Sequence, residues 1–396
     1  MRLTTLIKKL ADLEPDGFPF LSIYLDARAN ETGRGNYPVW LKGQLSEQRE
    51  QYKENEFELK RFDDVVERIN EYLESDADAA ANGIAIFASV NDEKPFFEAV
   101  QLDVPFEESL FFSYDRPHIF PLVRTVVEYP RYAVLWADTN KADIYVFDGE
   151  NRIRSDFQAD DHVDNIRNKT TGRTSAGGWS QNRYKRRIEK FHLQHAKEVV
   201  AELEDVMSKM DVKHLILAGD EATIMPILRP QLSKAVEDKV IGTLNLTQYD
   251  SEEEIREKSL EAVNMEMLTM QMGQVERTFD AARSASALGT LGLEETLRAL
   301  ANGQVQELLI SADLDSLEYD PNEVERIFKE YEPGDERLQG GTKPMARISA
   351  EVADELIRRA IDTDAEIFFI KDASLLEETG GVGAVLRYNM NTSAAG

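Results

Sequence analysis

Residues 132–157 read YAVLWADTNKADIYVFDGENRIRSDF, and this stretch decides the fold of the middle of the chain. Its apolar runs Tyr132–Ala137 and Ile144–Phe147 have the length and composition of strands, and Arg152–Phe157 is expected to be a third strand. The residues between the runs favour tight turns, above all the hairpin pair Asp148–Gly149. The stretch therefore predicts a meander of three antiparallel strands.

Helical and strand patterns alternate after the meander. Between Asn182 and about Lys209, apolar residues recur every three or four positions, which predicts an amphipathic helix. The apolar runs Leu215–Ala218 and Val240–Leu244 are expected strands, with a helix around Ile224–Leu228 between them. Three meander strands followed by this alternation predict a mixed sheet covered by helices.

The chain upstream of the meander predicts a small α/β unit that begins with the amphipathic segment Met1–Leu10. Its expected elements are a strand at Phe20–Leu25, a long helical stretch at Gln44–Leu73, and apolar runs at Ile84–Ala88 and Phe96–Leu102. Prolines at positions 117, 121 and 130 interrupt the pattern, so we place the first domain boundary near residue 128.

The chain downstream begins with a long helix rich in Glu and Met, over about Ser251–Ala285. Helices are then expected at Leu293–Leu300, Val352–Ala360 and Ala373–Glu378, and strands at Gln306–Ser311, Glu366–Ile370 and Ala384–Arg387. We predict an α/β (α+β) chain of three domains, residues 1–128, 129–272 and 273–396.

The composition excludes several classes of protein. Hydrophobic residues make up 42% and charged residues 30% of the 396 residues, which suits ordinary packed cores rather than disorder. The absence of cysteine excludes disulfide scaffolds, thiolate zinc sites, iron–sulfur clusters and cysteine nucleophiles. No run of 18 apolar residues and no secretory signal pattern is found, so we expect a soluble cytoplasmic protein without a membrane partner.

The charge distribution is uneven along the chain. Asp and Glu number 74 against 46 Lys and Arg, which gives a net charge of −28. Residues 167–190, here called the basic segment, hold eight basic residues and one acidic residue. Because nucleic acid repels an acidic body, only the basic segment could approach a phosphate backbone.

The basic segment reads RNKTTGRTSAGGWSQNRYKRRIEK and falls at the end of a predicted polar loop, residues 158–181, and the start of a helix. Gly177 and Gly178 allow close backbone approach to a ligand, and a helix start favours anions. The P-loop spacing is missing, which argues against an NTPase. A solvated loop before a basic helix would explain the composition without any ligand. The residues expected to contact RNA are Arg167, Lys169, Arg173, Trp179, Arg183, Lys185, Arg186, Arg187 and Lys190.

GGWSQNRY followed by a basic helix resembles the archaeo-eukaryotic peptide chain release factor family, whose middle domain carries a GGQ loop and a similar helix. The match looks closer to the bacterial relatives of that family, in which a glutamine lies slightly further along the loop. Thr379–Tyr388 (TGGVGAVLRY) resembles the closing strand of the third domain in release factors and in Pelota. The resemblance covers roughly residues 130–396 and leaves the first domain without a matched motif.

The resemblance implies a factor that enters the ribosomal A site and contacts rRNA and peptidyl-tRNA. The middle domain would be ribonuclease-H-like. The third domain would resemble the kink-turn-binding ribosomal proteins, and in this family it contacts a GTPase. The reaction would be hydrolysis of the ester between peptide and tRNA, with no metal and no cofactor. Gln181 would place the attacking water, while Gly177 and Gly178 would shape the loop whose N–H groups stabilise the oxyanion.

One departure from the family keeps a second hypothesis open. In an ungapped alignment, the position of the family's catalytic glutamine is occupied by Trp179, and Gln181 stands two residues later. Either the loop is rebuilt around Gln181, or the chain is a non-catalytic ribosome-binding factor for dormancy or rescue. Pelota works without the glutamine.

A nuclease is a third hypothesis, because Asp138, Asp143 and Asp148 fall at or near strand ends, and converging carboxylates hold the metals of such enzymes. Turn chemistry explains Asp138 and Asp148 equally well. His192 and His195 are spaced to share a metal, but no further ligand accompanies them, and packing or RNA contact accounts for both.

Overall fold

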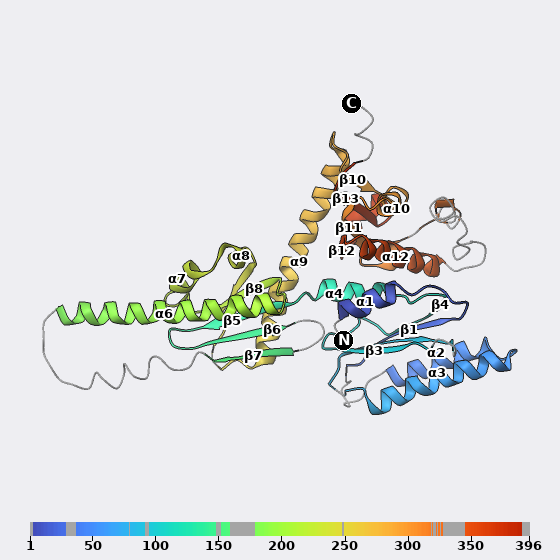
Figure 1. Cartoon of the computed structure of the whole chain (residues 1–396), viewed down its shortest axis with the longest axis horizontal. Helices are drawn as coiled ribbons and strands as arrows, with labels where there is room; N and C mark the ends of the chain where they lie inside the picture. Colours follow the sequence, from blue (N-terminus) through green and yellow to red (C-terminus); the bar gives the residue numbers. More distant parts are fainter. Residues whose placement is uncertain are drawn as a thin grey trace. The chain divides into compact units, whose positions relative to one another are not determined.

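The computed structural model describes residues 3–28, 37–78, 80–91, 95–147, 152–158, 179–247, 249–317, 319, 322, 324, 326–327 and 345–389, with side chains in all of these except 152–158, 179–185 and 345–346. The chain divides into two compact units (Figure 1). The first unit comprises Met1–Tyr129 and Leu268–Gly396, and the second comprises Pro130–Met267. The predicted division into three domains stays a prediction, although a separate sheet lies within each predicted span.

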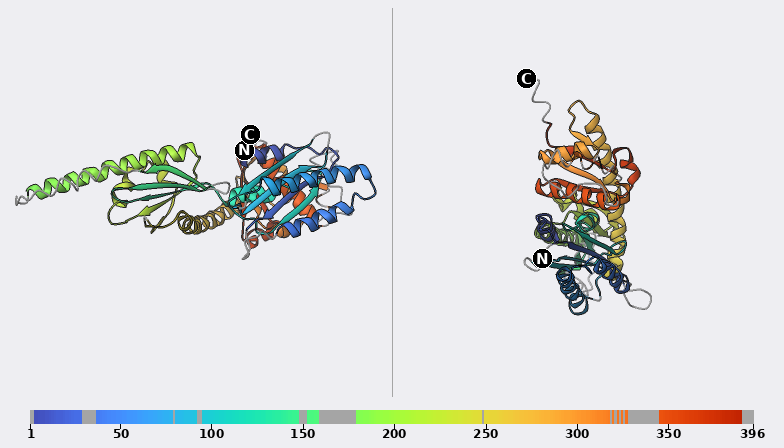
Figure 2. Two further views of the ribbon diagram at one scale, coloured as in Figure 1. Left: turned by 90° about the horizontal axis from the view of Figure 1, so that it is seen from below. Right: turned by 90° about the vertical axis from the view of Figure 1, so that its right-hand side faces the viewer.

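The first unit contains an antiparallel sheet of four strands in the order β3-β2-β1-β4. The strands are β1 (Phe20–Asp26), β2 (Gly83–Ser89), β3 (Phe97–Leu102) and β4 (Leu110–Tyr114). The helices of this part are α1 (Leu3–Ala11), α2 (Tyr37–Glu50), α3 (Glu56–Ser75) and α4 (Phe120–Glu128). Helices α2 and α3 lie together on one face of the sheet (Figures 1 and 2).

Strand β1 shows why this sheet is covered on both faces. Its residues alternate between two cores, so that Leu21 and Ile23 pack with residues of α2 and α3. Phe20 and Tyr24 pack with α1, α4 and residues of the second half of the chain. Because neither face of β1 meets water, the strand reads as a nearly continuous hydrophobic run in which Ser22 is the internal polar residue.

The second sheet of the first unit has four strands in the order β10-β13-β11-β12. These are β10 (Gly289–Leu291), β11 (Val305–Ser311), β12 (Glu366–Ile370) and β13 (Val382–Leu386). Strands β11 and β12 are parallel and the other pairs are antiparallel. Helices α10 (Leu293–Ala301) and α12 (Met345–Asp362) pack on one face, whereas residues of α9 (Glu252–Arg283) pack on the other.

A single core joins the two halves of the first unit, and α12 supplies two buried charges at this junction. Asp354 accepts the N–H groups of Ile119 (2.8 Å) and Phe120 (2.9 Å), where α4 begins. Its other oxygen lies 2.6 Å from Nδ1 of the buried His118. Ile119 has no side-chain cap of its own, so Asp354 serves as the cap of α4 and its charge complements the helix dipole.

Arg358 lies one turn further along α12 and stabilises the C-terminal end of a helix, whereas Asp354 stabilises an N-terminal end. Its guanidinium donates to the carbonyl oxygens of Leu10 (3.0 Å) and Ala11 (2.8 Å), where α1 ends, and also to the carbonyl of Pro117. Arg358 is only 4% exposed. The unpaired carbonyls at a helix C-terminus carry partial negative charge, which a buried guanidinium stabilises.

The second unit is built on a sheet of five strands in the order β7-β6-β5-β8-β9. Strands β5 (Tyr132–Ala137), β6 (Ala142–Phe147) and β7 (Arg152–Gln158) are the antiparallel meander, while β8 (His214–Gly219) and β9 (Val240–Leu244) add in parallel. One face is covered by α6 (Trp179–Lys209), α7 (Met225–Leu228) and α8 (Lys234–Glu237). The first part of α9 covers the other, through Ile255 and Val263.

These observations confirm the predicted fold class, a mixed α/β chain, and the mixed sheet with its helical cover. None of the helices in the described part of the chain is both long enough and apolar enough to cross a bilayer.

Three local expectations were wrong. The single helical stretch at 44–73 is two helices, because Asn55 caps a new one by accepting the N–H groups of Phe57 and Glu58. The prolines near the first boundary conceal helix α4, which tolerates Pro121 in its first turn, where no intrahelical N–H bond is needed. Helix α6 begins at Trp179 rather than near Asn182, directly after the helix-breaking glycines of the sequence.

Candidate functional site

Helix α6 carries the candidate site and is anchored by its second half. Ala196, Val199 and Leu203 are fully buried against the sheet, one helical turn apart. The start of the helix extends past the end of the sheet (Figures 1 and 2). The fold therefore fixes one half of α6, and no element in the described part of the chain covers the other half.

The basic residues of the α6 start that have described side chains are Arg186, Arg187 and Lys190. All three are exposed, and no ion pair joins any of them to another described side chain. The guanidinium of Arg187 lies 6.0 Å from the ring centre of Phe191, a cation–π contact that leaves its charge unneutralised. Three cations on about one turn of helix are thus available to an anionic partner.

The other end of α6 shows a different charge arrangement. Lys209 pairs with Asp205 at 2.6 Å, and Gln194 donates to Glu198 at 2.9 Å. Both pairs are spaced four residues apart, so they stabilise the helix locally. The basic residues of α6 are therefore concentrated at its start.

His195 holds α6 against the turn between β5 and β6. Burial lowers its pKa, while hydrogen bonding to the backbone of Lys141 works in the opposite direction. A histidine whose pKa lies below its ordinary value of 6.5 is neutral at pH 7. His195 therefore packs α6 onto the sheet and adds no charge to the site.

The predicted site residues differ in how much of each the structure describes. Gly177, Gly178, Arg167, Lys169 and Arg173 lie outside the described residues. For Trp179, Gln181, Arg183 and Lys185 the backbone is helical, in the first two turns of α6, and their side chains are not among those described. The roles assigned to these residues remain predictions.

The carboxylates of the nuclease hypothesis do not gather into a metal site within the described residues. Asp138 accepts the N–H groups of Asn140 (2.6 Å) and Lys141 (2.7 Å), as expected for a turn residue. Asp148 lies outside the described residues. In the described part of the chain, no three His, Asp or Glu side chains come close enough to hold a metal ion.

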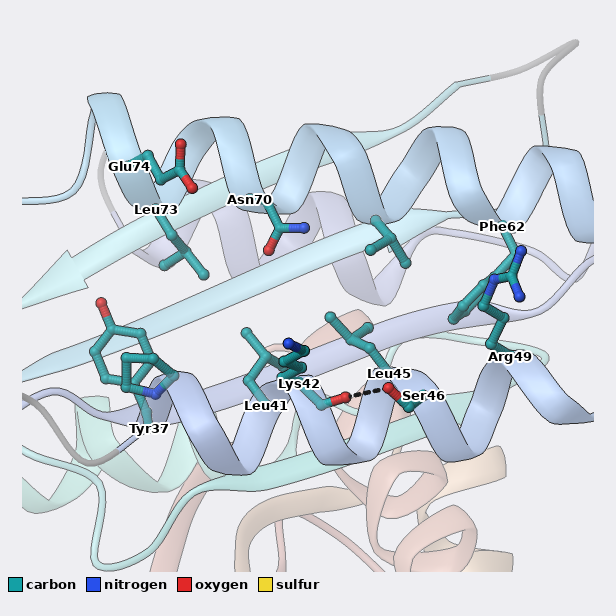
Figure 3. Close-up of a pocket in the computed structure, with 12 residues that line it drawn as sticks. Tyr37, Leu41, Lys42, Leu45, Ser46, Arg49, Phe62, Asn70, Leu73 and Glu74 are labelled. Atoms are coloured by element: carbon teal, nitrogen blue, oxygen red, sulfur yellow. Dashed lines mark hydrogen bonds between the residues drawn. The ribbon is translucent and has the colours of Figure 1, made fainter.

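Sequence reasoning missed a hollow between α2 and α3, which Figure 3 shows. Its volume is about 450 Å³, and its floor is apolar, with Leu41, Leu45 and Phe62. Lys42 lies on its α2 side and Glu74 on its α3 side. The signal that would have separated the two helices is Asn55 followed by Glu58, a typical helix-start spacing.

Comparison with known proteins shows what these features are similar to. Residues 117–264, which include the meander and the whole of α6, match the family described as bacterial archaeo-eukaryotic release factor family 10. Peptide chain release factor subunit 1 of Thermococcus onnurineus is 24% identical over 356 residues, covering 82% of this chain and 84% of the relative. The same factor of Methanosphaera stadtmanae is 28% identical over 313 residues, with 74% and 72% covered.

Solved structures with some likeness come from the same group of proteins. The archaeal Pelota of a ribosome-bound Pelota–ABCE1 model has 16% identity and a TM-score of 0.41, with 78% of each chain covered. The archaeal termination factor aRF1 has 15% identity and a TM-score of 0.26, with 98% of this chain and 97% of the factor covered. The family match and the sequence relatives lead to one conclusion: this chain is similar to the archaeo-eukaryotic release factors over most of its length, as its two sequence motifs predicted.

Proposed function

We propose that this chain acts at the ribosome as a release-factor-like protein that hydrolyses peptidyl-tRNA on stalled ribosomes. Its curated relatives are named peptide chain release factors and align along most of their length. The family match includes α6, the element that follows the glycine-rich motif. The proposal assigns the contact with rRNA and tRNA to the basic segment.

The observation that carries this proposal is the set of exposed cations at the start of α6. A chain with a net charge of −28 is repelled by RNA, so binding needs a surface that is locally positive. Arg186, Arg187 and Lys190 provide such a surface, since they are exposed and have no acidic partner among the described residues. Each phosphate that they neutralise would release counterions, which favours binding at low salt.

The proposed chemistry is water placement rather than proton abstraction. A glutamine amide does not titrate near neutral pH, so Gln181 would orient the water through its carbonyl oxygen and N–H groups. Gly177 and Gly178 would let backbone N–H groups approach the developing oxyanion. The positive end of α6, which begins at Trp179, adds a favourable potential for that negative charge.

The experiment compares Gln181→Ala with Gln194→Ala, a substitution of the same type further along α6, where Gln194 donates to Glu198. Peptidyl-tRNA hydrolysis on purified stalled ribosomes is expected to fall about 100-fold or more for Gln181→Ala and to stay unchanged for the control. Co-sedimentation with ribosomes should be the same for both. A wild-type protein that binds ribosomes without hydrolysing the ester would overturn the catalytic part.

A second candidate function is a non-catalytic factor that occupies the ribosomal A site during dormancy or rescue. It is favoured by Trp179, which stands at the family's glutamine position in the ungapped alignment. This candidate predicts ribosome binding without any hydrolysis and no effect of Gln181→Ala. The same assay therefore decides between the two.

A GTPase partner is proposed on the resemblance alone. If one delivers the chain, addition of a translational GTPase with a non-hydrolysable nucleotide should increase the fraction of chain that co-sediments with ribosomes. An unchanged fraction would argue for factor-independent binding.

A further inference from the structure

A cavity of about 580 Å³ lies within the first unit, beside β4 and α4. It also reaches the residues that follow β11 and β12, namely Ala312–Asp315 and Lys371. Because β11 and β12 are parallel neighbours, these residues stand at the carboxyl ends of two strands, the usual place for ligands in α/β sheets. The volume is in the range of sites for small ligands and side chains. We call it the α4 cavity.

Aromatic rings form much of the wall of the α4 cavity. Phe106 and Phe120 are buried, and Phe112 and Tyr114 are half-buried on β4. The rings of Phe112 and Tyr114 lie 5.5 Å apart between centres. Such rings suit an apolar stem, and their faces also attract cations.

The two cations in the wall are already neutralised. Arg124 donates to Glu128 at 2.8 Å and to Glu107 at 2.6 Å. Lys371 lies 3.6 Å from the second oxygen of Glu128, which is buried. Neither cation is therefore available to hold an anionic ligand without leaving a carboxylate uncompensated.

Three further carboxylates in the wall have no cationic partner among the described residues: Glu108, Asp313 and Asp315. Asp313 accepts the N–H of Asp315 at 3.0 Å, which caps a short 3-10 turn and leaves its charge in place. An acidic lining is not found in every hollow of this acidic chain. The charged residues that line the hollow between α2 and α3 are Lys42, Arg49 and Glu74, two basic and one acidic. The negative excess belongs to the α4 cavity.

We propose that the α4 cavity binds a guanidinium or ammonium group on an aliphatic stem. The stem would contact the aromatic wall, and the cation would lie near Glu108, Asp313 and Asp315. The same chemistry is found in the arginine or lysine side chain of a peptide and in a free aliphatic amine, and the experiment separates these sources. The proposal is independent of the ribosomal role proposed above.

The test uses the full chain and measures binding by isothermal titration calorimetry at low salt. The probes are an acetylated, amidated Gly-Arg-Gly peptide, its citrulline counterpart, and agmatine. Citrulline keeps the shape of arginine but has no charge. We expect the arginine peptide to bind at least about tenfold tighter than the citrulline peptide.

The matched variants are E108Q/D313N/D315N and the control E276Q/D280N/E295Q, which removes three exposed carboxylates elsewhere in the first unit. Asn retains the capping role at position 313, so the fold is expected to persist. The cavity variant should weaken the arginine peptide about tenfold or more, and the control variant should leave it unchanged.

Tighter binding of the peptide than of agmatine would assign the site to a basic protein segment, and the reverse order would assign it to a free amine. Equal binding of the arginine and citrulline peptides, equal weakening by both variants, or no binding of any probe at millimolar concentration would overturn the proposal. The comparison of arginine with citrulline uses only the wild-type chain, so it holds even if a variant fails to fold.

Discussion

The junction on α12 and the start of α6 use charged residues in opposite ways. At the junction, Asp354 and Arg358 are almost fully buried. Asp354 binds the start of α4 and His118, and Arg358 binds the end of α1 and the carbonyl of Pro117. At the start of α6, Arg186 and Lys190 are exposed and have no acidic partner among the described residues. The first pair joins the two halves of the first unit, whereas the second set makes no ion pair with a described residue that would stabilise the fold.

This difference teaches where to look for binding in an acidic chain. A buried charge must be compensated inside the protein, since desolvation costs several kcal/mol per ion. An exposed cation in a chain of net charge −28 has many acids available to it, so cations left without a partner mark a surface that is open to a ligand. The predictions below test both halves of this comparison.

The largest effect is expected from R186E/R187E/K190E. Reversal of three charges should weaken ribosome binding about a thousandfold, because each lost phosphate contact costs about tenfold at low salt. The slope of log affinity against log salt should fall by about one unit per contact. The free energy of unfolding should change by less than about 0.5 kcal/mol, as for other exposed substitutions.

The matched control is Lys209→Glu, at the paired end of the same helix. We expect it to leave the affinity for ribosomes within about twofold of wild type, since its charge is already held by Asp205. Equal loss of binding in the control and the triple variant would show that the net charge matters and the α6 start does not.

Next in size is Arg358→Met at the junction. The substitution keeps the apolar stem but removes the guanidinium that donates to the carbonyl groups of Leu10, Ala11 and Pro117. We expect a loss of about 3 kcal/mol in the free energy of unfolding, measured by urea denaturation. Arg298→Met, at an exposed pair with Glu294, should cost about 0.5 kcal/mol or less. Similar losses for the two variants would contradict the assigned role of the junction.

A third prediction concerns a buried polar group of the second unit, the hydroxyl of Tyr132. Burial raises the pKa of Tyr132 to about 12, and its hydroxyl lies 3.1 Å from that of Ser259. Between pH 10 and pH 12 the unfolded chain loses this phenolic proton while the folded chain keeps it. The stabilising term is therefore complete below pH 10 and is lost as pH rises, by about 1.4 kcal/mol per pH unit.

Tyr132→Phe should make the fall in stability between pH 10 and pH 12 shallower by about that amount, as urea titrations at several pH values would measure. Tyr249→Phe, at a ring that is 85% exposed, is the control. If the slope of the Tyr132→Phe variant matches that of wild type, the phenol ionises at the same pH in both states and the prediction fails.

The smallest effect is expected from Asn55→Ala at the start of α3. Loss of the side-chain acceptor for Phe57 and Glu58 should cost about 1 kcal/mol in unfolding free energy. Asn70→Ala, an exposed change inside the same helix, should be neutral or slightly stabilising because alanine favours helix. Equal losses at the two positions would show that the cap contributes nothing specific.

Much of the fold follows from local sequence patterns. The meander over residues 132–157 gave the antiparallel part of the second sheet because each strand pairs with the next one along the chain. The apolar spacing of α6 likewise predicted which residues pack on that sheet, since a helix has one fixed period. The basic character of the α6 start could also be read from the sequence, but its lack of acidic partners could not.

The junction could not be predicted from sequence, because its partners are far apart in the chain. His118 and Asp354 are separated by 236 positions, and nothing in the residues around either one indicates the other. The cap of α4 is supplied from α12, so the usual signal at the helix start is missing and the helix itself was overlooked. The α4 cavity was missed for the same reason, since β4 and Asp313 meet only through tertiary packing.

The shared core of the first unit has a consequence for how the chain is made. Residues such as Leu10 and Phe120 pack with Leu356 and Phe369, which leave the translating ribosome only after the whole second unit. At typical elongation rates, the early apolar surface waits on the order of ten seconds for its partners. The first third of the nascent polypeptide must therefore be protected from aggregation until α12 emerges. We expect a chaperone that binds exposed apolar segments to protect it during that interval.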